Sequence, residues 1–226
     1  MFQQPQADIL AMPDSQDFMN NQQITTGTTI MAVVYDGGVL IGADSRTSSG
    51  QYIVDRVADK LDYVHDRIFC LRSGSAADTQ TLCTYVRYYI DVHTVESGRR
   101  PAVKTAAKLF QNMIYEYKDN LSAAVIVAGV DDLLGPQIYN VNPNGSIFKQ
   151  QCATGGSGSG YIYGFVDSNF KENMSLDEAK KFIKQAISLS MSRDGSSGGI
   201  MRLMNITKEK VEREFVDLKD LPYRLY

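Results

Sequence analysis

A threonine that directly follows a glycine, Thr28 after Gly27, has the residue type and position for self-cleavage and nucleophilic catalysis. Residues 1–24 are polar and unpatterned, whereas residues 30–35 form an apolar, β-branched run that is typical of a buried strand. Threonine can act as a nucleophile and can use its own free N-terminal amine as the base. Cleavage between Gly27 and Thr28 would therefore create a catalytic residue. In the alternative interpretation, these hydroxyl residues and glycine form only a turn.

Two charged residues could assist such a threonine. A free amine at Thr28 would have an unperturbed pKa of roughly 7.7–8.0, close to the pH at which a general base works. A nearby cation such as Lys60 would lower that pKa, and Asp44 could hold the lysine in place. Gly27, without a side chain, would let the Thr28 hydroxyl approach the preceding carbonyl. The alternative is that Asp44 shapes a turn and Lys60 is a solvated surface charge.

Other residue types argue against competing chemistries. The two histidines, His65 and His93, lie outside any zinc-binding spacing and are interpreted as structural. A hydrolase of this sequence would therefore use a base other than histidine, and neither a metal nor another cofactor is expected. The glycine-rich residues 155–160 lack both the GK[ST] ending and the dinucleotide spacing of nucleotide-binding loops.

Arg72 lies where an expected strand gives way to the N-terminus of a helix. An arginine at the mouth of a cleft would select a ligand that carries a carboxylate, through two parallel hydrogen bonds. The alternative is an ordinary surface arginine.

The apolar patterning predicts strands, two helices, strands, two helices and two final strands, with residues 44–50 as a polar loop. Ser75 with Asp78, and Ser175 with Glu178, are predicted to form capping boxes at helix starts. The first helix is expected to have Tyr89 and His93 on its apolar face, the second to open at Pro101, and a helix over 161–166 to pack through glycines. Strands are expected over 28–35, 39–44, 67–72, 122–130, 137–141, 146–150, 200–206 and 211–216. This order predicts an α+β fold with two sheets covered by helix layers.

The composition is that of a globular protein, with 226 residues, 43% hydrophobic and 22% charged, and a net charge of −3. No basic block is present, which argues against a nucleic-acid partner, and the longest apolar runs are too short to span a membrane. Residues 1–27 lack the features of a secretory signal. Three widely spaced cysteines, Cys70, Cys83 and Cys152, suit buried thiols in a reducing compartment, so an intracellular protein is expected.

A set of motifs in order along 28–226 resembles a catalytic beta subunit of the proteasome core particle. The motifs are Gly27-Thr28-Thr29, residues 42–46 (GADSR), Lys60, residues 73–78 (SGSAAD), residues 156–158 (GSG) and residues 193–199 (RDGSSGG). One such motif would be weak, whereas the set at matching separations is specific. The resemblance implies the fold of an N-terminal-nucleophile hydrolase, a four-layer αββα sandwich. It also implies a propeptide over 1–27, removed by self-cleavage, and a single domain over 28–226.

The resemblance further implies roles for individual residues. Thr28 would supply both the nucleophilic hydroxyl and the basic amine, with Asp44 and Lys60 tuning the proton transfer. The other matched residues are Ser157, Asp194 and Ser197, which position the threonine amine, Gly74, whose amide stabilises the oxyanion, and Thr47, Ser48 and Ala76, which bind the substrate backbone as an added strand.

Among catalytic beta subunits, the runs over 25–33, 66–80 and 193–199 resemble the beta-1, caspase-like type. In that type Arg72 would line the primary specificity pocket and favour Glu or Asp before the cut bond. The resemblance thus implies a caspase-like, peptidyl-glutamyl-hydrolysing threonine endopeptidase of intracellular protein degradation. It would act on unfolded polypeptide in the cytoplasm and nucleus, assembled with other alpha and beta subunits in stacked seven-membered rings, with no nucleic-acid or membrane partner.

Three alternatives are weighed against this expectation. A non-catalytic structural ring subunit of the same fold is disfavoured because Thr28, Asp44 and Lys60 are all present. A small-molecule amidohydrolase would use the same N-terminal chemistry but act on small amides. A nucleotide-binding module would require a site at residues 155–160.

Overall fold

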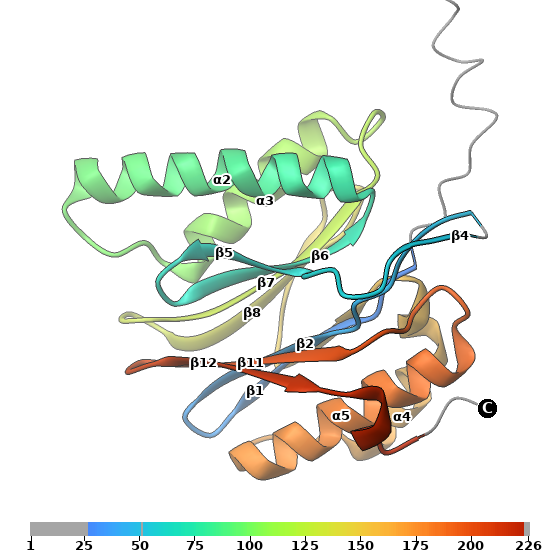
Figure 1. The fold of residues 1–226 in the computed structure, drawn as a ribbon. Coiled ribbons are helices and arrows are strands. Elements are labelled where there is room, and N and C mark those ends of the chain that lie inside the picture. The colour runs from blue at the N-terminus through green and yellow to red at the C-terminus, as the bar shows by residue number, and fades with distance from the viewer. Residues whose placement is uncertain (1–26, 51, 224–226) are drawn as a thin grey trace, which may run out of the picture.

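Two antiparallel sheets lie face to face between two layers of helices (Figure 1). The computed structural model describes residues 27–50 and 52–223, so residues 1–26 of the expected propeptide lie outside the described part of the chain. The arrangement of helices and sheets confirms the predicted four-layer αββα sandwich. No helix within the described residues is long and apolar enough to cross a membrane.

The elements follow the chain in this order. The strands are β1 (Ile30–Tyr35), β2 (Gly38–Ala43), β3 (Thr47–Ser49), β4 (Tyr52–Asp55), β5 (Leu61–His65), β6 (Ile68–Gly74), β7 (Ala123–Asp131), β8 (Gly135–Val141), β9 (Ile147–Gln150), β10 (Cys152–Gly155), β11 (Met201–Thr207) and β12 (Val211–Val216). The helices are α2 (Ala76–Ser97), α3 (Val103–Glu116), α4 (Tyr163–Asn169) and α5 (Leu176–Arg193), with the short 3₁₀ helices η1 (Ser157–Tyr161) and η2 (Leu218–Asp220).

One sheet has the strand order β10-β1-β2-β11-β12 and the other the order β5-β6-β7-β8-β9. Helices α4 and α5 cover the first sheet, and α2 and α3 cover the second (Figure 1). Strands β3 and β4 form a separate two-stranded sheet. The ends of β1, β2, β6 and β10 carry or adjoin most of the predicted site residues.

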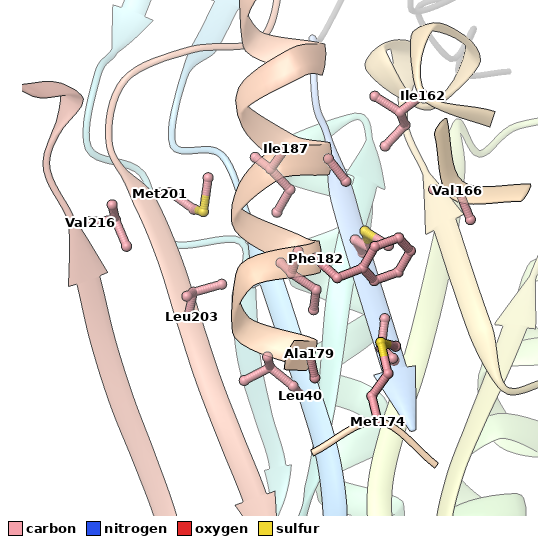
Figure 2. Packing of buried hydrophobic residues seen from close by; sticks show 14 of the residues in the cluster. Leu40, Ile162, Val166, Met174, Ala179, Phe182, Ile187, Met201, Leu203 and Val216 are labelled. Atoms are coloured by element: carbon pink, nitrogen blue, oxygen red, sulfur yellow. The ribbon is translucent and has the colours of Figure 1, made fainter. Parts of the chain in front are cut away.

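Strand β1 shows how the layers are held together. Its side chains alternate, so that Ile30 and Ala32 pack between the two sheets while Met31 and Val33 pack against the helix layer. All four are fully buried, which explains why this run is apolar without interruption. In the helix-facing core, Phe182 and Ile187 of α5 pack over the first sheet (Figure 2).

The two predicted helix starts are formed, one of them differently from the expectation. At α5, the Ser175 hydroxyl accepts from the Glu178 amide and the Glu178 carboxylate accepts from the Ser175 amide, which is a complete capping box. At α2, Ser75 accepts from the Asp78 amide, but the Asp78 carboxylate accepts from the amide of Ser122 instead of closing a box. Asp78 therefore ties α2 to the segment that enters β7.

Four strands were not predicted. Strand β3 lies within the expected polar loop over 44–50, and β4, β5 and β10 lie in segments without a predicted strand. These strands are short, and β5 and β10 lie at sheet edges, where a long apolar run is not required. His65, expected in a turn, is the last residue of β5.

Three helix predictions are also wrong in detail. Helix α3 begins at Val103 with Ala102 as its N-cap, so Pro101 precedes the helix. Helix α4 begins at Tyr163 and does not pack through its glycine, because Gly164 faces open space. Tyr89 and His93 of α2 are exposed, since the narrower stripe of Leu82, Val86 and Ile90 is enough to cover the sheet.

We expect Phe182→Ala to lower the free energy of unfolding by about 3–5 kcal/mol, because the ring is buried and leaves a cavity. The ring stacks on Phe165 at a centroid distance of 5.8 Å. Phe148→Ala, at a half-exposed position of the edge strand β9, is the matched control and should cost far less. Denaturant unfolding of the two variants gives the comparison, and equal losses would contradict the packing described.

Candidate active site

A buried ion pair lies at the centre of the predicted site. Asp44, directly after β2, has no exposed surface, and the side chain of Lys60, just before β5, is 7% exposed. The Lys60 ammonium donates to Asp44 Oδ1 at 2.7 Å. The same Nζ atom also donates to the carbonyl oxygen of Gly27 at 3.1 Å. The lysine therefore connects a buried carboxylate to the peptide bond that precedes Thr28.

The Asp44 carboxylate also organises the backbone around the site. Its Oδ1 accepts from the amide of Thr29 at 2.8 Å, and its Oδ2 accepts from the amides of Gly198 at 3.0 Å and Arg46 at 3.2 Å. Two segments that are distant from Asp44 in sequence, at Thr29 and Gly198, thus converge on its side chain. Asp44 consequently acts as more than the turn residue of the alternative interpretation.

Burial changes the acidity of both partners. It lowers the pKa of the Lys60 ammonium, and the attraction of Asp44 only partly opposes this effect. Burial also raises the pKa of the Asp44 carboxyl, while Lys60 and the backbone donors oppose the rise. The lowered pKa brings Lys60 closer to the range in which an amine can take up and release a proton at neutral pH.

Thr28 is held next to the carbonyl of Gly27. Its hydroxyl donates to that carbonyl oxygen at 2.7 Å, and Thr28 is 4% exposed. A side chain at position 27 would meet the backbone oxygen of Ser196 at 2.1 Å, so only glycine fits there. The Thr28 hydroxyl and the Lys60 ammonium therefore converge on the same carbonyl oxygen.

On the other side, the nitrogen of Thr28 faces a group of hydroxyls and one carboxylate. It donates to Ser157 Oγ at 3.1 Å, and Ser157 Oγ donates to Asp194 Oδ2 at 2.7 Å. Ser197 Oγ donates to the same carboxylate oxygen at 2.6 Å. The structure thus brings together the three residues that the resemblance matched to positioning of the threonine amine.

A small cavity of about 70 Å³ opens beside Thr28, and we call it the Thr28 cavity. It is lined by Gly27, Thr28, Thr47, Ala58, Asp59, Lys60, Arg72, Gly74, Ala76, Thr79 and Gln80. Of the predicted substrate-binding residues, Thr47, Arg72 and Ala76 belong to this lining. Ser48 is buried in β3 and does not belong to it, and neither histidine lines it.

Gly74, the predicted oxyanion donor, lines both the Thr28 cavity and an adjoining cavity of about 460 Å³. Its φ of +102° is in the region that favours glycine, and a side chain would meet the carbonyl oxygen of Ser122 at 2.3 Å. This backbone conformation is therefore restricted to glycine at the wall shared by the two cavities.

A family model described as "Proteasome subunit" matches residues 24–206. The chain belongs to the proteasome subunit family. Membership implies that it assembles with other proteasome subunits in a core particle.

Relatives over most of the chain are beta subunits. The proteasome chain is 53% identical over 199 residues to proteasome subunit beta type-6 of Dictyostelium discoideum, across 88% of this chain and 93% of that protein. It is 49% identical over 191 residues to proteasome subunit beta type-1 of Saccharomyces cerevisiae, across 84% and 88%. It is 46% identical over 200 residues to proteasome subunit beta type-9 of Homo sapiens, across 88% and 91%. The resemblance of the motifs to a proteasome beta subunit is confirmed.

Two further residues of this proteasome subunit belong to the site and were missed in the sequence. Thr29 Oγ1 lies 2.8 Å from Ser197 Oγ and 2.6 Å from Ser190 Oγ, and Ser190 Oγ donates to the carbonyl of Gly158 at 2.9 Å. In the sequence, Thr29 belongs to the Gly27-Thr28-Thr29 motif without a role of its own, and Ser190 lies outside all the matched motifs. The available signal was chemical, since a fully buried hydroxyl needs a partner.

We expect Asp44→Ala to lower the free energy of unfolding by about 3–5 kcal/mol, because it leaves a buried ammonium and three backbone amides without their acceptor. Adding Lys60→Met should cost less than the sum of the two single changes, since it removes the unpaired charge. Urea unfolding measures all three variants. Additive losses would show that Asp44 and Lys60 are not coupled. The control is Glu212→Ala, which removes one partner of the exposed ion pair with Lys210 and should change the free energy of unfolding little.

Proposed function

We propose that this proteasome beta subunit is a threonine endopeptidase that cleaves itself between Gly27 and Thr28 and then cleaves polypeptides after acidic residues. The observation that carries the proposal is the convergence of Thr28 Oγ1, at 2.7 Å, and Lys60 Nζ, at 3.1 Å, on the carbonyl oxygen of Gly27. A nucleophile and a cation thus meet at the peptide bond whose cleavage would free the threonine amine.

This geometry supports self-cleavage. The Thr28 hydroxyl adds to the Gly27 carbonyl carbon and loses its proton, while the Lys60 ammonium stabilises the negative charge that develops on the carbonyl oxygen. The carbon–nitrogen bond then breaks, the nitrogen takes up a proton, and Gly27 becomes an ester of the Thr28 hydroxyl. Water hydrolyses this ester, which releases residues 1–27 with a new carboxyl terminus and leaves Thr28 with a free amine.

Substrate hydrolysis would use the same groups. The Thr28 hydroxyl attacks the scissile carbonyl and gives its proton to the free Thr28 amine, which later returns it, while the neighbouring Lys60 ammonium tunes the acidity of that amine and the amide of Gly74 stabilises the oxyanion. The leaving amine departs with a proton, and water then hydrolyses the acyl ester. Ser157, Asp194 and Ser197 support this role by holding the Thr28 nitrogen in one orientation.

The surroundings of Thr28 support the substrate class. Arg72 lines the Thr28 cavity and would favour a carboxylate in the residue before the cut bond, while Thr47 and Ala76 of the same lining would bind the substrate backbone. We further propose that the subunit works in stacked seven-membered rings with other alpha and beta subunits, on unfolded polypeptide in the cytoplasm and nucleus.

We expect Thr28→Ala to keep residues 1–27 attached and to abolish cleavage after glutamate, because the nucleophile is removed. Thr28→Ser is the matched variant, and it should still cleave because it retains a hydroxyl and an amine. Intact mass and hydrolysis by assembled core particles, with the other active subunits inhibited, give the two results. Normal processing in Thr28→Ala would remove Thr28 from the nucleophile role.

We expect Arg72→Met to lower kcat/KM for a peptide with glutamate before the cut by at least about tenfold and to raise it for leucine, because donors to a carboxylate are lost. Arg99→Met, at an exposed position after α2, is the control and should change neither value. An unchanged preference in Arg72→Met would place the specificity elsewhere.

A further inference from the structure

Asp62 lies behind Arg72 and faces the same guanidinium. In the register of β5 and β6, Asp62 is opposite Cys70, and Arg72 lies two residues further along β6 on the same face. Asp62 Oδ2 forms an ion pair with Arg72 Nε, with side-chain exposures of 25% and 9%. A partly buried carboxylate thus pairs with the Arg72 guanidinium, the group to which the family resemblance assigns substrate specificity.

The other contacts of Arg72 further occupy its donors. Arg72 Nη2 donates to the carbonyl of Asp59 at 2.7 Å, and Nη1 donates to Thr79 Oγ1 at 3.4 Å. A guanidinium carries four Nη–H donors besides its Nε–H, so these two hydrogen bonds leave two Nη donors for a ligand, while Nε is ion-paired with Asp62 without a hydrogen bond. The guanidinium is therefore fixed by the protein and still able to bind oxygen.

The charges around the Thr28 cavity are balanced within the protein. The charged side chains in its lining are Asp59, Lys60 and Arg72. Lys60 pairs with Asp44, Asp59 pairs with Arg213 at 2.7 Å, and Arg72 pairs with Asp62. None of the cations in the described lining is without a carboxylate partner. A substrate carboxylate that enters this cavity loses hydration without meeting an uncompensated positive charge.

We propose that Asp62 is a specificity-determining residue, which makes this cavity select a hydrogen-bond acceptor, glutamine as well as glutamate, instead of negative charge alone. The proposal rests on the proposed function and refines its substrate class. The two remaining donors of Arg72 can bind the amide oxygen of glutamine or the carboxylate of glutamate. An apolar side chain such as leucine would leave them unpaired and is disfavoured.

The test compares peptides that differ only in the residue before the cut bond, which is glutamate, glutamine or leucine. Assembled core particles carry the wild-type subunit or Asp62→Asn, with the other active subunits inhibited and Thr28→Ala particles giving the background. Asp62→Asn keeps the shape and one oxygen acceptor but removes the charge. Asp62→Ser is a second charge-neutral variant in case the first does not assemble. Asp66→Asn removes an exposed charge from the neighbouring β5–β6 turn and is the matched control.

The wild type should cleave after glutamate and glutamine with kcat/KM values within about fivefold of each other. Asp62→Asn and Asp62→Ser should raise the glutamate-to-glutamine ratio by roughly tenfold, because the uncompensated guanidinium attracts only the charged substrate more strongly. Asp66→Asn should leave the ratio unchanged. Thr28-dependent cleavage with the same ratio in Asp62→Asn and wild type would overturn the role of Asp62. Absence of Thr28-dependent cleavage of all three peptides would instead overturn the proposed function, and this inference with it.

Discussion

A buried ammonium is stable only beside a carboxylate, and Lys60 has Asp44 at 2.7 Å. The rest of the site depends on this constraint. Because Asp44 must meet Lys60, the end of β2 and the segment before β5 are fixed against each other. Because the same carboxylate accepts from the amides of Thr29 and Gly198, the start of β1 and the loop after α5 are fixed to it as well. In this arrangement the Lys60 ammonium already donates to the carbonyl oxygen of Gly27.

The two-sheet fold is what allows segments from the whole chain to meet here. Strands β1 and β2 bring Thr28 and Asp44 to one end of the first sheet, and β10 pairs with β1, so that Ser157 follows directly beside Thr28. Thr29 links the two halves of the site. Its amide donates to Asp44, and its hydroxyl contacts Ser197, which donates to Asp194. Thr29 therefore connects the Asp44–Lys60 pair on one side of Thr28 with the Ser197–Asp194 pair on the other side.

The sequence predicted what local patterns determine. The capping box at Ser175 and the doubly buried run after Thr28 depend on residues near in sequence, and both predictions are confirmed. The pairing of β10 with β1 depends on a partner more than a hundred residues away, and its short segment of small residues has no pattern of its own. Family resemblance supplied the candidate residues, and the structure brings nearly all of them to Thr28. The family resemblance could not supply Asp62, because the ion pair of Asp62 with Arg72 follows from strand register and not from a motif.

The intact mass of this chain, recovered from its natural assembly, tests the central claim most directly. The account predicts a chain that begins at Thr28, since a hydroxyl and an ammonium already converge on the carbonyl of Gly27. A mature particle whose subunit retains residues 1–27 would contradict the account. Thr28 would then have no free amine, and the subunit would be a structural member of its ring.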